Sequence, residues 1–382
     1  MASAGSAVEP VVAPPVEETP QAPRKRVLLI SNRVMHYRVS VYNYFWRHFQ
    51  ENGWEFAVLS NEMQRTNQNQ CQFEFIELPF NFSTYRKEIK RFKPDAVILF
   101  LHMKDRILWP LIHWLKLSGI PVALWTKARN LDDLDNRIRN AFFDYLHLMS
   151  NGLILYTASL MRFIPERQRS KVFIANNTVN FEDYPAIPES KEQIKRELNI
   201  PFQKVVLFAG RIGEERNRKK VDHLIDLFRD LDRTDAGLVI VGSGLSDELR
   251  ARMNPANTFY LGEVHDPENR QISRIFKMAD ICSIPGHVGL GLNQAFFWGL
   301  PMVTEQGNQP PEIEYLRDGE NGFIVAEDDR AALRDRLLFL LDNDEQRCRM
   351  SANARRDILE NASIEGMFHG FLSCISAIAR QP

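Results

Sequence analysis

The stretch PGHVGLGLNQAFFWGLPMV, from Pro285 to Val303, decides the fold of this 382-residue chain. It follows the short apolar run DICSI, passes through a glycine-rich turn and continues into an apolar segment of helical length. A helix that begins directly behind such a turn presents unpaired backbone amides, and these attract anions. The stretch therefore predicts a strand, a turn and a helix, with an anion cradle at the turn for a phosphate-bearing ligand.

Similar short apolar runs surround this stretch and alternate with longer amphipathic segments. Their apolarity is continuous, which is typical of parallel strands covered by helices on both faces. We therefore expect an α/β fold with two doubly wound parallel sheets, each a Rossmann-like domain, and FEFIEL at Phe73 as an edge strand. The runs are VLLIS, FAVLS, DAVILF, PVALW, GLILY and VFIA in the first half, and VVLFAGR, GLVIVGSG, TFYLGEV, DICSIP, PMVTE and FIVA in the second half.

The domain boundaries follow from where this alternation stops. Residues 1–23 are rich in Ala, Pro, Val and Glu and predict a disordered tail without a secretory signal. Residues 24–180 predict the first domain, the proline-interrupted residues 181–202 a linker, and residues 203–360 the second domain. We expect a last helix in residues 361–382, a candidate to cross back to the first domain.

Candidate binding residues gather at three strand ends of the second half. Gly210 and Arg211 end one strand, Gly242, Ser243 and Gly244 end the next, and the turn Pro285–Leu290, with Gly286, His287, Val288 and Gly289, ends the third. Ligands of open parallel sheets bind at such carboxyl ends, where glycines let the backbone approach them closely. Arg211 and the nearby Lys219 are cations that could neutralise a diphosphate.

With these residues in place, the second half resembles the nucleotide-binding domain of the GT-B glycosyltransferases, in particular the retaining family 4. The resemblance covers about residues 203–360 and is carried by FAGRIGEERNRKKVDHLIDLF, LVIVGSG, VGLGLNQAFFWGLPMV and PPEIEYLRDGENGFIV. It implies that Arg211 and Lys219 bind the diphosphate of a nucleotide-sugar donor. The first half resembles the family more thinly, through ISNRVMHYRVSVYNYF and IANNTVNFEDY.

The chain departs from the family at two acidic positions. The commonest family pattern has one Glu near the donor sugar and a second on the ribose, and Gly286 and Gln294 stand at these places. Gln294 can still exchange hydrogen bonds with a ribose diol, whereas Gly286 offers only backbone. We interpret the departure as a variant of the family, with a catalytically dead copy as the alternative.

Further candidates lie outside these turns. Glu312 is a candidate to face the donor, although acids also suit any helix start. The family often has a His beside the donor sugar after a strand like PVALW, and Lys127 is the nearest equivalent in this chain. His36, Tyr37 and Arg38 end the opening strand on the side expected for the acceptor.

Composition limits the partners. The formal net charge is −1, and nothing resembles a nucleic-acid-binding stripe. The four cysteines suggest neither zinc nor disulfides, and no apolar run is long enough for a membrane helix. Residues 24–150 carry 19 Lys and Arg against 12 Asp and Glu, and they interleave aromatics with cations. This mixture favours a cytoplasmic protein in contact with the inner face of an anionic membrane, although aromatic core helices would look similar.

These observations together predict a glycosyltransferase that moves a sugar from a nucleotide-diphosphate donor to a glycan or lipid-linked acceptor in cell-surface polysaccharide or glycolipid assembly. The cationic pair predicts transfer without a metal or other cofactor, and the resemblance implies retention of anomeric configuration. Two alternatives stay open: an epimerase or phosphorylase on the same fold, and a degenerate binding scaffold.

Overall fold

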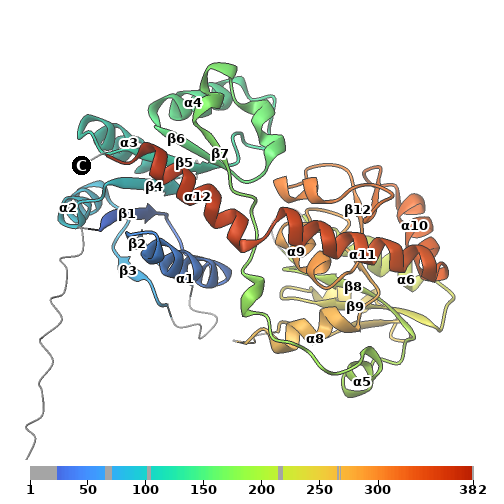
Figure 1. Ribbon diagram of the computed structural model, residues 1–382. Coiled ribbons are helices and arrows are strands. Elements are labelled where there is room, and N and C mark those ends of the chain that lie inside the picture. The colour runs from blue at the N-terminus through green and yellow to red at the C-terminus, as the bar shows by residue number, and fades with distance from the viewer. Residues whose placement is uncertain are drawn as a thin grey trace, which may run out of the picture.

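The computed structural model describes residues 24–64, 71–100, 105–213, 218–264, 266 and 268–380, so the predicted tail, residues 1–23, lies outside the described residues. The chain forms two lobes joined by a narrow waist (Figure 1). Each lobe holds one sheet in which every strand pairing is parallel, as predicted. The fold is therefore α/β with two Rossmann-like domains.

The first domain contains a seven-stranded sheet in the order β3-β2-β1-β4-β5-β6-β7, with the alternating segment FEFIEL at its edge as β3. Its central strands are buried along almost their whole length, because helices cover both faces. The strands are β1 (Lys25–Ile30), β2 (Trp54–Ser60), β3 (Glu74–Glu77), β4 (Ala96–Phe100), β5 (Val122–Thr126), β6 (Gly152–Leu155) and β7 (Val172–Ile174). The helices are α1 (His36–Glu51), α2 (Phe82–Phe92), α3 (Leu108–Leu117) and α4 (Arg137–Met149), with 3-10 turns η1 (Ala158–Phe163) and η2 (Glu166–Lys171).

The second domain contains a six-stranded sheet in the order β10-β9-β8-β11-β12-β13. The strands are β8 (Lys204–Ala209), β9 (Ala236–Val241), β10 (Thr258–Tyr260), β11 (Ile281–Ser283), β12 (Met302–Glu305) and β13 (Gly322–Val325). The helices are α6 (Val221–Arg229), α7 (Asp247–Ala251), α8 (Arg270–Met278), α9 (Leu290–Phe297), α10 (Arg330–Asp342) and α11 (Asp344–Asn361), with the 3-10 turn η4 (Pro311–Tyr315). Strand order reverses between β8 and β11, and such a reversal opens a crevice at the carboxyl ends of the two strands.

The segment expected as a linker is folded against the second domain. It contains the 3-10 turn η3 (Phe181–Asp183) and helix α5 (Lys191–Glu197), which begins at the side-chain cap of Ser190. Ile187, Ile194 and Phe202 belong to the second hydrophobic core. The proline-rich composition therefore marks the passage between the domains, but the second core starts before residue 203.

The last helix, α12 (Ile364–Ile378), returns to the first domain, as Figure 1 shows in red. Phe371 lies 4.8 Å from Phe45 of α1 and 5.1 Å from Trp125 of β5 between ring centroids. Gly152 lets Cys374 approach the sheet, because a Cβ on Gly152 would lie 2.5 Å from the Cys374 sulfur. The chain thus crosses the waist twice, which ties the two domains together.

Neither domain contains, among its described residues, a helix long and apolar enough to cross a bilayer.

Candidate functional site

The carboxyl ends of β8 and β9 form two glycine turns that pack against each other. A Cβ on Gly242 would lie 1.8 Å from the carbonyl oxygen of Gly210, and one on Gly244 would lie 2.0 Å from that of Ile212. The amide of Ile212 donates to the carbonyl of Ser243 at 2.7 Å. Backbone contact at this range excludes side chains, so these glycines bring the two strand ends together beside the crevice.

Lys219 lies directly over this strand end. A Cβ on Gly210 would meet the Lys219 Cε at 2.9 Å, and the Lys219 ammonium donates to the carbonyls of His287 at 3.0 Å and Val288 at 3.4 Å. The ammonium therefore bridges the ends of β8 and β11. Arg211, next to Gly210, has an exposed side chain at the same strand end.

The PGHVG turn is held against the segment that carries Lys219. The amide of Gly286 donates to the carbonyl of Lys219 at 3.1 Å, and the amide of His287 donates to that of Arg218 at 2.7 Å. A Cβ on Gly286 would lie 2.0 Å from the Arg218 carbonyl oxygen. The position where the family most often has an acid is therefore glycine because the neighbouring backbone fills the space of a side chain.

The amides of the turn are only partly open to an anion, which corrects the sequence prediction at Val288. Its amide donates to the Gln309 side-chain oxygen at 3.1 Å, so Val288 contributes to the shape of the turn. Gly289, with φ 56°, starts α9 without a side-chain cap. Among the amides that the sequence predicted to bind an anion, those of Gly289 and Leu290 have no acceptor within the described chain and are available to one.

One turn further along α9, Gln294 lines a hollow of about 140 Å³ between the domains. The Gln294 amide donates to the Tyr184 hydroxyl at 2.8 Å. His36 and Tyr37 lie on the opposite wall, so the structure brings these two acceptor-side candidates to the hollow. The complete lining is His36, Tyr37, Ser40, Val179, Asn180, Tyr184, Val264, Asp266, Asn269, Ile272 and Gln294.

Arg38 and Glu312 take another role than the sequence predicted. The Arg38 guanidinium is buried 4.5 Å from the centre of the Trp125 ring and donates to the Asn177 side-chain oxygen at 2.7 Å. The Asn177 amide in turn donates to the buried Glu312 carboxylate. Arg38 and Glu312 are therefore joined through Asn177 in the junction between the domains. Neither side chain belongs to a solvated surface that could bind the acceptor or the donor.

Lys127 stands on the first-domain side of the crevice, opposite the PGHVG turn. Burial, with Arg218, Lys219 and Lys127 near the ring, lowers the pKa of His287 from 6.5 to about 3. Because the imidazole is then neutral at pH 7, it adds no charge to the cationic surroundings. The structure thus brings Lys127, Lys219 and His287 to one site from two domains.

Sequence reasoning missed Asp132, which reaches the same site from the loop behind β5. Its carboxylate accepts from Arg218 Nη2 at 3.1 Å and from Asn308 Nδ2 at 2.6 Å, both in the second domain. The bond from Asn308, together with Arg218, holds the pKa of Asp132 below its ordinary value. Only its place five residues after Lys127 marked it in the sequence.

A cluster of one histidine and two acids, partly buried, lies beside α6. His223, Glu305 and Asp328 place three ligand atoms within 4.8 Å of one another, the spacing of a metal site. The Lys220 ammonium lies among them, 3.0 Å from Glu305 and 2.7 Å from Asp328. Lys220 thus provides a positive charge to this cluster, whereas the neighbouring Lys219 contacts the PGHVG turn.

Comparison with known proteins agrees with this geometry. Residues 190–357 match the family described as Glycosyl transferases group 1. The chain is 26% identical over 286 residues to a phosphatidyl-myo-inositol mannosyltransferase of Mycobacterium leprae, a match that covers 70% of this chain and 73% of the relative. It is 29% identical over 184 residues to a D-inositol 3-phosphate glycosyltransferase of Corynebacterium efficiens, covering 44% of this chain and 42% of that one.

A solved structure shows the same fold over the whole length. The Anabaena protein HepE, solved in complex with UDP, superposes with a TM-score of 0.74 at 13% identity, covering 92% of this chain and all of that one. The arrangement of two Rossmann-like lobes is therefore shared with that protein. Residues 190–357 are therefore similar to the Glycosyl transferases group 1 family, and the chain is a glycosyltransferase of the GT-B fold.

Proposed function

We propose that this glycosyltransferase moves a sugar from a nucleoside diphosphate donor to an acceptor hydroxyl, without a divalent metal and with retention of anomeric configuration. The observation that carries the proposal is the position of Lys219. Its ammonium lies over Gly210, contacts the PGHVG turn and stands at the switch point of the sheet.

The chemistry of donor cleavage explains why a cation belongs there. When the bond between sugar and diphosphate breaks, negative charge builds on the phosphate oxygens and positive charge on the sugar. Preorganised donors aimed at the leaving group stabilise that charge most effectively. Lys219, Arg211 and the amides of Gly289 and Leu290 are the groups that supply this stabilisation.

The nucleoside end of the donor fits the hollow at Gln294. Leu290 and Gln294 lie four residues apart on α9, a rise of about 6 Å, which suits a ligand with phosphate at one end and ribose at the other. Gln294 Nε2 donates to the Tyr184 hydroxyl. Gln294 Oε1 has no hydrogen bond with the described residues and can accept one from a ribose hydroxyl. The HepE structure was solved in complex with UDP, which supports a nucleotide donor for this chain.

Metal independence follows from the same cations. An ammonium and a guanidinium at the diphosphate can neutralise the charge that a divalent ion neutralises in other transferases. Retention rests on the resemblance to family 4. The inositol-lipid mannosyltransferase, and a lipopolysaccharide core mannosyltransferase of Rhizobium meliloti that is 24% identical, support a glycan or lipid-linked acceptor in cell-surface assembly.

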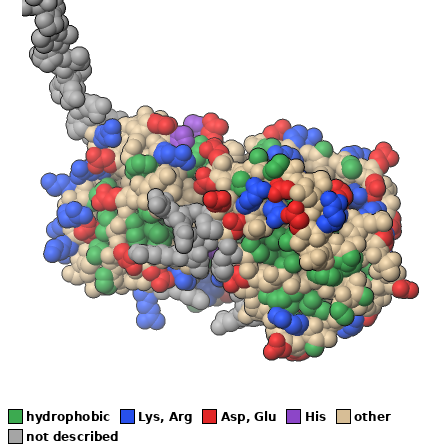
Figure 2. Space-filling model, turned by 90° about the horizontal axis from the view of Figure 1, so that it is seen from below, with side chains coloured by type: hydrophobic (Ala, Val, Ile, Leu, Met, Phe, Trp, Pro, Cys, Tyr) green, Lys and Arg blue, Asp and Glu red, His purple; other side chains and the backbone are tan. Residues whose placement is uncertain are grey.

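A membrane-facing surface on the first domain suits such an acceptor. The described chain has eight large hydrophobic side chains that are clearly exposed, and six of them fall between Leu117 and Leu148. Ile138, Phe142, Tyr145 and Leu148 lie at helical spacing along α4, and Ile138 is 84% exposed. Arg137 and Arg139 stand on either side of Ile138 in the sequence, and Figure 2 shows further Lys and Arg side chains along the left edge of the same domain. Apolar side chains flanked by cations suit the surface of an anionic bilayer. By contrast, Phe143 is buried and belongs to the packing of α4.

A donor screen tests the reaction. The protein is incubated with UDP-glucose, UDP-galactose and GDP-mannose in EDTA, with and without inorganic phosphate, and sugar release and stereochemistry are followed by NMR. Hydrolysis or transfer from one donor in EDTA with retention supports the proposal. Turnover that strictly needs a divalent metal contradicts metal independence, an epimerised donor identifies an epimerase, and strict dependence on phosphate identifies a phosphorylase.

Vesicle flotation tests the surface. We expect Ile138→Glu to weaken binding to vesicles that contain anionic lipid, while Phe339→Glu on α10, which changes a side chain 40% exposed in the other domain, leaves binding unchanged. Equal binding by wild type and Ile138→Glu contradicts the assignment.

A further inference from the structure

Gly286 leaves the proposed donor sugar without the carboxylate that the family most often offers it. The hydroxyls of a hexose are usually held by charged acceptors, because hydrogen bonds to ionised groups are stronger than those to neutral ones. A Cβ at residue 286 would lie 2.0 Å from the Arg218 carbonyl oxygen, so no acid can occupy this position without moving the chain. A carboxylate for the sugar has to come from another segment.

Asp132 brings a carboxylate to the same place from the first domain. Arg218, which pairs with the PGHVG turn through its carbonyl, donates to Asp132 through its guanidinium at 3.1 Å. Asn308, the second donor at 2.6 Å, precedes Gln309, whose amide donates to the Gly286 carbonyl at 2.8 Å. Both groups that hold Asp132 are therefore parts of the wall around Gly286.

The carboxylate is oriented with one oxygen left for a ligand. Arg218 and Asn308 both donate to Oδ1, and the described residues make no hydrogen bond to Oδ2. The Asp132 side chain is 52% exposed, so a ligand can reach it. The lowered pKa of Asp132 keeps the group ionised and therefore a strong acceptor at neutral pH.

The loop that carries Asp132 is built to hold its shape. Ala128 is fully buried with φ 63°, a conformation that costs energy in any residue with a side chain. Arg129 donates to the carbonyl of Asn140 at 2.7 Å and pairs with Asp144 at 2.7 Å, which fastens the loop to α4. Paired side chains hold this strained turn in place. This indicates that the loop fixes the position of Asp132.

We propose that Asp132 takes the place of the acid that this chain lacks at residue 286, and that its Oδ2 accepts hydrogen bonds from hydroxyls of the donor sugar. This inference rests on the proposed function, since it concerns the sugar half of the same donor. Because Asp132 belongs to the first domain and the diphosphate cations to the second, recognition of the sugar requires both domains at once.

Calorimetric titration separates the sugar from the diphosphate. UDP and UDP-glucose, and GDP and GDP-mannose, are titrated into wild type, Asp132→Ala, Asp132→Asn and the matched control Asp135→Ala, an exposed acid on the same loop. Loss of a hydrogen bond to a charged group lowers affinity by roughly 10-fold to 100-fold. We expect this loss in Asp132→Ala for the sugar nucleotide alone, a smaller loss in Asp132→Asn, and affinity for the free diphosphate that is unchanged or higher because a nearby negative charge is gone.

An equal loss for the nucleoside diphosphate and its sugar conjugate would show that Asp132 merely fastens the domains and would overturn the inference. So would affinities in Asp132→Ala that match wild type, or a loss of the same size in Asp135→Ala. If wild type binds none of the four nucleotides, the proposed function fails instead. The two failures are therefore distinguishable in one set of titrations.

Discussion

The substitution Gly286→Ala tests whether the PGHVG turn positions Lys219. The added Cβ would lie 2.0 Å from the carbonyl oxygen of Arg218, 2.8 Å from its carbonyl carbon and 3.0 Å from the carbonyl carbon of Lys219. All three atoms are backbone, so no side chain can rotate away to make room. The segment at residues 218–219 has to move by about 1 Å or more before the contact is acceptable.

The cost follows from what that movement breaks. The two backbone hydrogen bonds from Gly286 and His287 are worth about 1 kcal/mol each, and overpacking of this kind costs about 1–3 kcal/mol. A total of about 4 kcal/mol corresponds to a fall in Tm of roughly 10 °C for a domain of this size. A shift of 1 Å at a catalytic group also lowers the rate by about 100-fold.

Differential scanning calorimetry and a donor turnover assay measure both effects. Gly366→Ala is the control, because its Cβ would meet only the Ser363 hydroxyl at 3.1 Å in the first turn of α12. If Gly286→Ala keeps the wild-type Tm and the wild-type rate, the turn does not hold Lys219 in place and the reasoning is refuted.

Three further predictions concern stability. Burial lowers the pKa of His147 from 6.5 to about 3, so below pH 6.5 the unfolded chain takes up a proton that the folded chain refuses, and stability falls as the pH falls. His147→Leu should therefore lose about 2 kcal/mol less than wild type between pH 7.5 and 5.0 in urea unfolding, and parallel pH profiles would disprove this. Asn177→Leu leaves the buried charges of Arg38 and Glu312 without their shared partner. In urea unfolding it should lower the free energy of unfolding by about 3–5 kcal/mol, and adding Glu312→Gln should recover part of this loss. An unchanged unfolding midpoint would show that this junction does not stabilise the protein. Gly152→Val should push Cys374 of α12 off the sheet and lower the Tm by several degrees, whereas a wild-type melting curve would mean that α12 contributes little to the first core.

The strand ends could be predicted because their signals are local. A continuous apolar run predicts a buried parallel strand, and the glycines behind it predict a tight turn, so Gly210, Gly242 and Gly286 were found from neighbours in the sequence. These strand ends meet at one edge because β9, β8 and β11 are parallel neighbours, and ligands of such sheets bind where the strand order reverses. Lys219 was found in the same way, because it closely follows a strand end.

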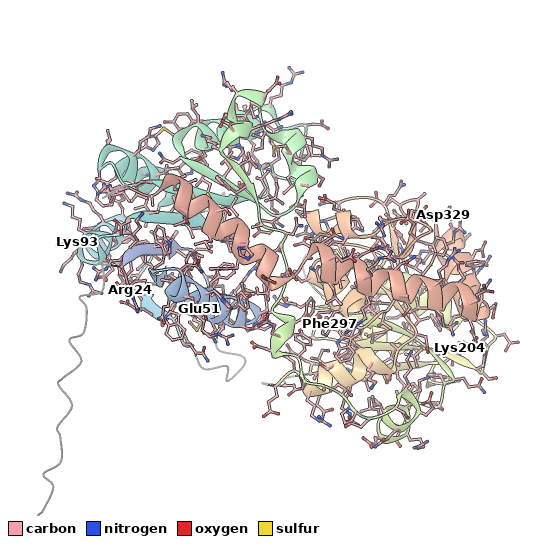
Figure 3. The ribbon with its side chains drawn as sticks, in the orientation of Figure 1. Arg24, Glu51, Lys93, Lys204, Phe297 and Asp329 are labelled. Atoms are coloured by element: carbon pink, nitrogen blue, oxygen red, sulfur yellow. The ribbon has the colours of Figure 1, made fainter. Side chains whose placement is uncertain are left out.

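The contacts between the domains could not be predicted, because nothing local encodes them. Asp132 and Asn308 are 176 residues apart in the chain, and Asn177 meets Glu312 across 135 residues. The aromatic contact between Phe181 and Phe297, whose rings stack at 4.3 Å, likewise joins the passage between the domains to α9; Figure 3 labels Phe297 at this waist. Arg38 looked like an exposed cation after a strand because its contacts with Trp125 and Asn177, far away in the sequence, leave no pattern in its own segment.

The most direct measurement is the affinity of Lys219→Met for a diphosphate compared with the same nucleoside that has no phosphate. Methionine keeps most of the length of the side chain and removes the charge together with the two hydrogen bonds to the PGHVG turn, so nucleoside binding serves as the check that the site persists. With whichever of UDP or GDP the wild type binds, the account predicts that Kd for the diphosphate rises by roughly 10-fold to 100-fold while binding of uridine or guanosine is unchanged. A diphosphate Kd equal to that of wild type would contradict the claim that this ammonium holds the leaving group.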